Sequence, residues 1–162
     1  MDKPNKMNGV CPFFSNLDEL RGVLNKLPRE SKIVYTYGAW DLLHPGHVIF
    51  LARAKALGDF LILGVVADEP IKNLKGKQRP LQTQVERVMT SGSLRCVDAV
   101  VLQPEYDPSE QLKILEQVDI LTKADDWEYI PGSETIEKLG GELIKLSYTE
   151  EFSTSNLVRK IQ

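Results

Sequence analysis

Apolar segments and helix-like patterns alternate along the chain from residue 31 onward. Five apolar segments of strand length predict buried β-strands, at 33–37, 60–67, 98–102, 119–123 and 142–146. The segment FLILGVVA, residues 60–67, is apolar throughout, which is typical of a parallel strand covered on both faces. The intervals between these segments carry apolar residues at helical spacing.

Helices are predicted in those intervals and near both ends of the chain. We expect them at 16–27, 46–57, 82–94, 108–117, 132–139 and 153–161. Gly58 follows the second of these helices and favours a glycine C-cap there. Alternating strands and helices predict parallel strands joined by right-handed crossovers. The expected fold class is therefore α/β, a Rossmann-like doubly wound parallel sheet of about five strands with helices on both faces.

Composition narrows the class of protein. The 162 residues fit one domain, and the net charge of −3 without a Lys/Arg run argues against a nucleic-acid partner. Cys11 and Cys96 are far apart and match no metal-binding spacing. The N-terminal residues lack the pattern of a signal peptide, and the longest apolar run, 60–67, is too short to span a bilayer. We expect a cytoplasmic protein with no membrane partner.

Both histidines of the chain fall in one turn, GAWDLLHPGH, directly after the first long strand. His44 and His47 flank Pro45 and Gly46 at a predicted helix start, where free amides and the helix dipole favour an anion. Ligands of doubly wound sheets bind beyond the carboxyl ends of the strands, and Gly38 would allow the backbone to approach one closely. The alternative is that one histidine caps the helix and the other packs. Two imidazoles in one turn favour a phosphate site.

A basic segment, DEPIKNLKGKQRP, follows the second long strand and is interpreted as a loop. It carries four cations, Lys72, Lys75, Lys77 and Arg79. It is either a solvated basic loop or the place where a polyphosphate is neutralised. Arg87, in the next helix, either contacts phosphate or pairs with Glu86 or Asp98.

Two further segments lie where ligand contacts are expected. TKADDWEY follows a later strand, and Trp127 within it either stacks on a base or covers the sheet edge. FSTSN precedes the last predicted helix, where Ser153 and Thr154 suit either an N-cap or terminal phosphates. The sequence shows neither a nucleophile beside a base nor a GxGxxG after a strand. Transfer chemistry that depends on positioning and charge stabilisation fits these features best.

The motif GAWDLLHPGH resembles the G-x-F-D-x-x-H-x-G-H motif of the cytidylyltransferase-like nucleotidyltransferases. LKGKQRP is similar to the K-G-x-x-R-P loop of that family, Arg87 falls where the family carries a helix arginine, and FSTSNLVRKI is similar to its S-T-T helix start. The resemblance covers residues 31–162. It implies an N-terminal extension with one helix, residues 1–30, and a nucleotidyltransferase domain, residues 31–162.

Two branches of the family remain open. The N-terminal helix and IPGSETIEKLGGELIKL resemble heptose 1-phosphate adenylyltransferases, which we rank first. TYG and DDWE resemble CTP-dependent glycerol-3-phosphate cytidylyltransferases. Three residues depart from the family pattern: Trp40 replaces Phe, Ala124 stands within the expected Lys-Gly-Gly, and Ser155 replaces the second Thr. A nucleotide-binding module without turnover is the alternative of another class.

The resemblance also implies roles for individual residues. An acceptor phosphate would attack the α-phosphorus of a nucleoside triphosphate and release pyrophosphate, with His44, His47 and Lys75 as catalytic groups. Nucleotide contacts are expected from Tyr37, Gly38, Ala39, Trp40, Gly46, Arg87, Lys123, Asp125, Asp126, Trp127, Ser153 and Thr154. Contacts with the phosphorylated small-molecule acceptor are expected from Asp41, Asp68 and Arg79. The resemblance implies Mg²⁺ bound through the phosphates, without protein ligands, and leaves a homodimer open.

Overall fold

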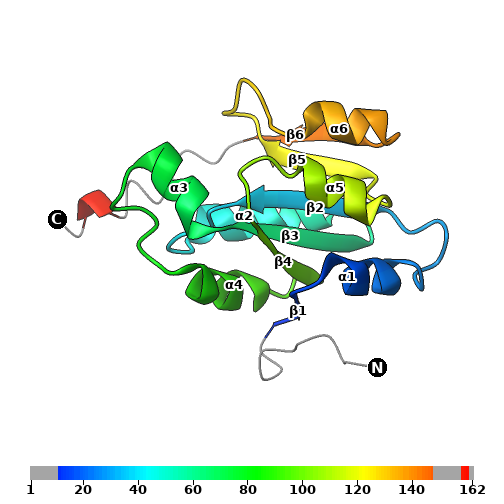
Figure 1. Cartoon of the computed structure of the whole chain (residues 1–162), viewed down its shortest axis with the longest axis horizontal. Helices are drawn as coiled ribbons and strands as arrows, with labels where there is room; N and C mark the ends of the chain where they lie inside the picture. Colours follow the sequence, from blue (N-terminus) through cyan, green and yellow to red (C-terminus); the bar gives the residue numbers. More distant parts are fainter. Residues whose placement is uncertain (1–10, 148–157, 161–162) are drawn as a thin grey trace.

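The six strands of the described chain form one sheet in which every pairing is parallel. The computed structural model describes residues 11–147 and 158–160. The strand order is β1-β4-β3-β2-β5-β6 (Figure 1). The strands are β1 (Phe13–Phe14), β2 (Ile33–Gly38), β3 (Phe60–Val66), β4 (Ala99–Gln103), β5 (Ile120–Ala124) and β6 (Glu142–Leu146). The predicted doubly wound α/β fold is confirmed.

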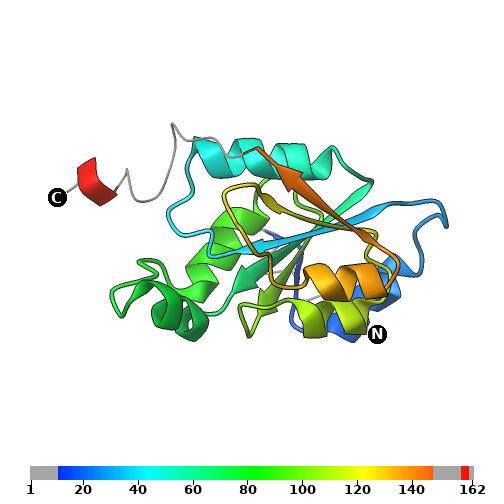
Figure 2. The ribbon, with the colours of Figure 1, turned by 90° about the horizontal axis from the view of Figure 1, so that it is seen from above.

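Helices cover both faces of this sheet (Figure 2). The helices are α1 (Leu17–Leu24), α2 (Pro45–Lys55), α3 (Asp68–Lys75), α4 (Gln84–Gly92), α5 (Ser109–Leu115) and α6 (Ser133–Lys138). One apolar cluster packs α1, α5 and α6 against one face, and a second packs α2 and α4 against the other. Helix α3 lies beyond the carboxyl end of β3 (Figure 1). Strands with both faces covered explain why the apolar segments of the sequence are continuous.

Two elements were not predicted from the sequence. The two-residue strand β1 adds a sixth strand by pairing with β4. The segment interpreted as a basic loop begins with helix α3, so that interpretation is wrong for Asp68–Lys75. Asp68 and Glu69 in the first turn favour a helix start, and Pro70 is tolerated there because first-turn amides need no helical partner.

The expected glycine C-cap of the second predicted helix is also wrong. Helix α2 ends at Lys55 with Ala56 as its C-cap residue, in a right-handed conformation. Gly58 is needed for a different reason, since a Cβ there would lie 2.6 Å from the carbonyl oxygen of Lys32. This glycine therefore permits a close approach between two chain segments.

Strand β2 is the point at which the strand order reverses. β3 and β4 follow it on one side, and β5 and β6 lie on the other. The segments that leave the carboxyl ends of β2 and β5 therefore face one another across the switch point, where ligands of such sheets bind. The histidine turn follows β2, and the TKADDW segment forms the end of β5 and its exit.

A matched pair of glycine substitutions tests the packing of the sheet. A Cβ at Gly64 would lie 2.6 Å from both Gln103 Oε1 and the Tyr35 hydroxyl, which are hydrogen-bonded to each other in the interior. Gly64→Ala is expected to lower the free energy of unfolding by about 1–3 kcal/mol. Gly22→Ala in α1, where a Cβ meets nothing within 4 Å, should raise it by about 0.5–1 kcal/mol. Denaturant unfolding measures both, and equal effects would contradict this account.

Candidate active site

The turn between β2 and α2 stacks the two imidazole rings. Trp40 and Leu42 adopt left-handed backbone conformations, with φ of 55° and 49°, which turn the chain back toward the sheet. The indole Nε1 of Trp40 donates to the carbonyl oxygen of Gly64 at 3.0 Å and pins the turn to β3. His44 is the N-cap residue of α2, and its ring stacks on His47 with centroids 3.8 Å apart.

Both histidines are kept uncharged by their surroundings. Burial lowers the pKa of His44, and burial together with electrostatic coupling to His44 and to the charge of Lys75 lowers the pKa of His47 to about 3. Each Nδ1 atom is buried and has no hydrogen-bond partner among the described residues. Buried polar atoms are normally paired, so these nitrogens indicate a ligand or water partner. Neutral imidazoles at pH 7 offer one N–H donor each.

The position of the Trp40 side chain explains why residue 38 is a glycine. A Cβ at Gly38 would lie 3.2 Å from Cε2 of Trp40, so the glycine makes room for the indole. The indole packs edge-on against His47, with ring centroids 5.5 Å apart. His44 makes no side-chain capping bond at the start of α2, which includes Gly46 in its first turn. His44 therefore occupies the N-cap position, as one interpretation of the sequence had it, but its imidazole does not cap the helix.

Lys75, at the end of α3, acts electrostatically on the histidine turn. The residue is exposed, but partial desolvation of its ammonium group and the charge of Arg79 lower its pKa. The charge of Lys75 in turn contributes to the low pKa of His47, which places the two groups in one electrostatic site. Lys72 on the same helix instead pairs with exposed Glu69 at 2.5 Å.

Lys123 approaches the turn from β5, on the other side of the switch point. It is buried, and its Nζ donates to the carbonyl oxygen of Tyr37 at 2.9 Å. The ammonium lies 4.3 Å from the Tyr37 ring centroid and 4.8 Å from that of Trp127. Trp127 stacks on Tyr106 at 5.7 Å. Burial and the charge of Lys75 lower the pKa of Lys123 to about 7.

Tyr106 was not among the site residues predicted from the sequence. Its position could have indicated it, because Tyr106 is an aromatic residue shortly after β4, at the edge where ligands bind. Asp126, by contrast, was predicted, and its negative charge partly offsets the lowering of the pKa of both Lys75 and Lys123. Its carboxylate therefore belongs to the same site.

Strand β6 holds the segment that leaves β5. The backbone amide of Asp125 donates to the carbonyl oxygen of Leu146 at 2.8 Å. A second contact holds the same segment, since Lys145 Nζ donates to the carbonyl oxygen of Trp127 at 3.1 Å. Strand β6 therefore fixes the course of this segment, and with it the position of Trp127 beside Lys123.

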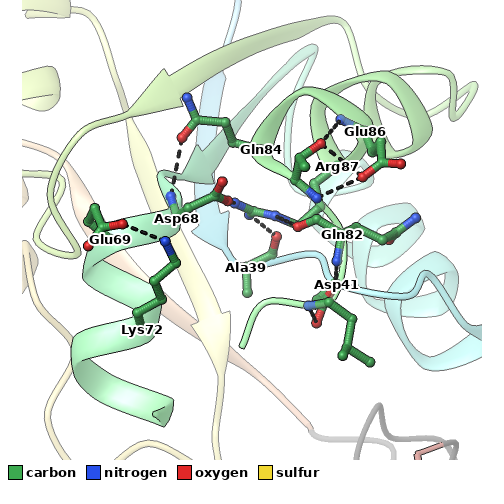
Figure 3. Close-up of polar contacts among 11 residues, drawn as sticks. Ala39, Asp41, Asp68, Glu69, Lys72, Gln82, Gln84, Glu86 and Arg87 are labelled. Carbon is green, nitrogen blue, oxygen red and sulfur yellow. Dashed lines mark hydrogen bonds and ion pairs between the residues drawn. The ribbon is translucent and has the colours of Figure 1, made fainter. Parts of the chain in front are cut away.

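Four other predicted site residues contact protein groups. Asp41 accepts hydrogen bonds from the Leu81 and Gln82 amides, at 2.9 and 3.0 Å, and pairs with Arg79 at 3.2 Å. Arg87 is fully buried and pairs with Asp68 at 2.6 Å (Figure 3). The suggested pairings of Arg87 with Glu86 or Asp98 are therefore wrong.

The structure thus brings most of the predicted residues to one edge of the sheet. The histidine turn, Lys75, Lys123, Asp126 and Trp127 form the site. Asp41, Asp68, Arg79 and Arg87 lie in the polar contacts that support it. Ser153 and Thr154 lie outside the described residues, as does most of the helix predicted at 153–161.

Comparisons with known proteins identify the family. Residues 35–160 match the cytidylyltransferase-like family. The bifunctional protein HldE of Citrifermentans bemidjiense is 38% identical over 153 residues, and that of Helicobacter pylori is 37% identical over 160. These alignments cover 91% and 96% of this chain but only 31% and 33% of the relatives. The chain belongs to the cytidylyltransferase-like family, and the resemblance found in the sequence is confirmed.

Solved structures agree with this assignment. The lipopolysaccharide core biosynthesis protein of Thermoplasma volcanium is 28% identical, with a TM-score of 0.65 over 74% of this chain and 98% of that one. Pantothenate synthetase of Thermus thermophilus, at 17% identity and a TM-score of 0.56 over 90% of this chain and 66% of that one, shares the fold. Within the described residues, no helix has the length and apolar character that crossing a membrane requires.

The protonation of His47 predicts how stability depends on pH. Its pKa is about 3 in the folded protein and near 6.5 when unfolded, so the unfolded state binds more protons between these values. Stability should fall as pH drops below 6.5, with a contribution from His47 of at most about 1.4 kcal/mol per pH unit. Denaturant unfolding from pH 7 to pH 4 should give a flatter curve for His47→Gln. Parallel curves would contradict this assignment.

Lys123 predicts a second pH dependence at higher pH. Its folded pKa of about 7 lies below the unfolded value of 10.5, so the unfolded state again binds more protons between them. The stability of the wild-type protein should rise relative to Lys123→Met as pH increases from 7 to 10. Unfolding of both proteins across this range measures the difference, and a constant difference would show that Lys123 has an ordinary pKa.

Proposed function

We propose that the protein transfers a nucleoside monophosphate from a nucleoside triphosphate to a phosphorylated small molecule and releases pyrophosphate. The observation that carries this proposal is the stacked pair of uncharged imidazoles, His44 and His47, at the start of α2, with Lys75 in the same electrostatic site. Donors without charge, beside separate cations, suit a reaction that shifts negative charge among phosphate oxygens.

The proposed reaction needs little proton transfer. An oxygen of the acceptor phosphate attacks the α-phosphorus, and the bond from that phosphorus to the pyrophosphate oxygen breaks. Pyrophosphate leaves with the bonding electron pair. The acceptor oxygen is already anionic near neutral pH, so no general base is required, and the roles left to the protein are positioning and charge stabilisation.

The side chains of the site divide these roles. His44 and His47 would donate N–H groups to the α-phosphate oxygens as charge develops, and Lys75 would neutralise the phosphates from α3. Lys123 would present positive charge from β5, beside Trp127. We propose that Mg²⁺ enters with the triphosphate, because this cation prefers phosphate and water oxygens whereas the donors here are imidazoles and amines. When bound, it would neutralise phosphate charge.

For the acceptor we propose heptose 1-phosphate, with ATP as the donor. The support comes from the resemblance of residues 130–146 to that branch, and from the similarity to a protein of lipopolysaccharide core biosynthesis. CTP with glycerol 3-phosphate remains the second candidate, favoured by DDWE and by the position of Trp127 in the site. A homodimer is a further proposal from the same resemblance, and cytoplasmic location is a further proposal from the composition of the sequence.

Pyrophosphate release from the purified protein with Mg²⁺ tests these proposals. ATP and CTP are each offered with heptose 1-phosphate and with glycerol 3-phosphate. Release with ATP and the heptose phosphate supports the first candidate, and release with CTP and glycerol 3-phosphate supports the second. Triphosphate binding without release from any pair would indicate another acceptor or a nucleotide-binding module.

Substitutions in the histidine turn and in α3 test how much each group contributes to catalysis. His47→Ala should lower kcat about 10²–10³-fold, which is typical for loss of one transition-state donor. Lys75→Ala should also lower kcat, whereas Lys72→Ala on the same helix should leave it near wild type because Lys72 pairs with exposed Glu69. Steady-state pyrophosphate release measures all three, with circular dichroism to verify folding. Near wild-type turnover of His47→Ala would refute the assignment.

A further inference from the structure

The guanidinium group of Arg87 joins three segments that are separate in the sequence (Figure 3). Its Nη1 donates to the carbonyl oxygen of Ala39 in the histidine turn at 2.5 Å. Its Nη2 donates to Asp68 at the start of α3 at 2.6 Å, and its Nε donates to the carbonyl oxygen of Gln82 at 3.2 Å. Since the side chain is fully buried in α4, all three nitrogens are directed at protein groups.

A second set of contacts ties the histidine turn to the segment before α4. The Asp41 carboxylate accepts from the amides of Leu81 and Gln82. The Gln82 side chain accepts from the amide of Leu42 at 2.8 Å. Gln82 is therefore held through its amide, its carbonyl and its side chain, between the turn and Arg87.

Helix α3 depends on polar contacts for its placement. Ile71 is the buried side chain of this eight-residue helix. Its first residue is anchored twice to α4, because the Asp68 carboxylate pairs with Arg87 and the Asp68 amide donates to Gln84 Oε1 at 3.2 Å (Figure 3). With one buried apolar side chain, α3 is held chiefly by the polar contacts at its start, and Lys75 lies at its other end.

We propose that Arg87 is a positioning residue that fixes the distance between Lys75 and the histidine turn, and that it does not bind phosphate. The same guanidinium holds the turn through Ala39 and holds α3 through Asp68. The inference rests on the proposed function only in treating Lys75 and His47 as catalytic groups. The placement of Lys75 beside His47 is testable without any substrate.

The two histidines allow this test by NMR of the ligand-free protein. The charge of Lys75 contributes to the low pKa of His47, so a retreat of α3 should raise that pKa. Asp68→Asn is the decisive variant, because direct loss of a negative charge would lower the pKa of His47 whereas a retreat of Lys75 would raise it. We expect a rise of about half a pH unit or more.

Two comparisons separate positioning from general loosening. In a Lys75→Ala background, Asp68→Asn should no longer raise the pKa of His47, because the charge that retreats is already absent and only the direct loss of the Asp68 charge remains. Thr83→Ala removes the capping box of α4 without touching the three Arg87 contacts, and should lower Tm while leaving the His47 titration unchanged. An unchanged or lowered His47 pKa in Asp68→Asn would overturn the proposal.

Steady-state kinetics of Arg87 variants distinguish a positioning residue from a residue that binds phosphate. Arg87→Lys retains a charge for Asp68 and should lower kcat less than Arg87→Met does. Arg87→Met should lower kcat by about tenfold or more. Both variants should show little change in the KM for triphosphate. A raised KM with unchanged kcat and an unchanged His47 titration would show a phosphate ligand instead. If no triphosphate and acceptor pair reacts, the proposed function fails while the NMR result still decides this inference.

Discussion

The reversal of strand order at β2 is the constraint on which the site depends. Parallel strands deliver all their exits to one edge of the sheet, and the reversal brings the exits of β2 and β5 together. The bond from Lys123 on β5 to the carbonyl oxygen of Tyr37 on β2 joins the two halves at this point. The imidazoles of the following turn and the aromatic rings around Lys123 thus belong to one site, although His47 and Lys123 are 76 positions apart in sequence.

The interior beneath this edge is polar, unlike the two apolar clusters on the faces of the sheet. Arg87 and Asp68 form a pair that is largely removed from water, and Asp41 holds two backbone amides. Such groups are costly to bury unless they are hydrogen-bonded, and here Arg87 and Asp41 each have at least three partners. Loops that carry catalytic groups are usually the mobile parts of a fold, and this network gives these loops a defined position.

The sequence was sufficient for the fold because five strands are short, mostly apolar segments with helical patterns between them. It was insufficient for α3, since eight residues with Pro70 and one buried side chain leave almost no helical pattern. The positions of the histidines and of the basic residues along the sequence were enough to locate the histidine turn and the basic segment. The sequence did not reveal the partner of Arg87, because Asp68 is brought to that side chain by the crossover between β3 and α4. Contacts of this kind follow from the assembled sheet.

Because the two imidazoles are neutral, electrostatic attraction of the substrate and hydrogen bonding to it would depend on different side chains of the site. The positive charge that would attract a triphosphate is carried by lysines, of which Lys75 is exposed, while the donors at the histidine turn carry none. Ionic strength screens exposed charges strongly and short hydrogen bonds from buried neutral groups far less. For the proposed transfer, salt would therefore weaken the binding of substrate while leaving the rate of the chemical step nearly constant. Ionic strength would then change turnover only through the fraction of sites that hold substrate.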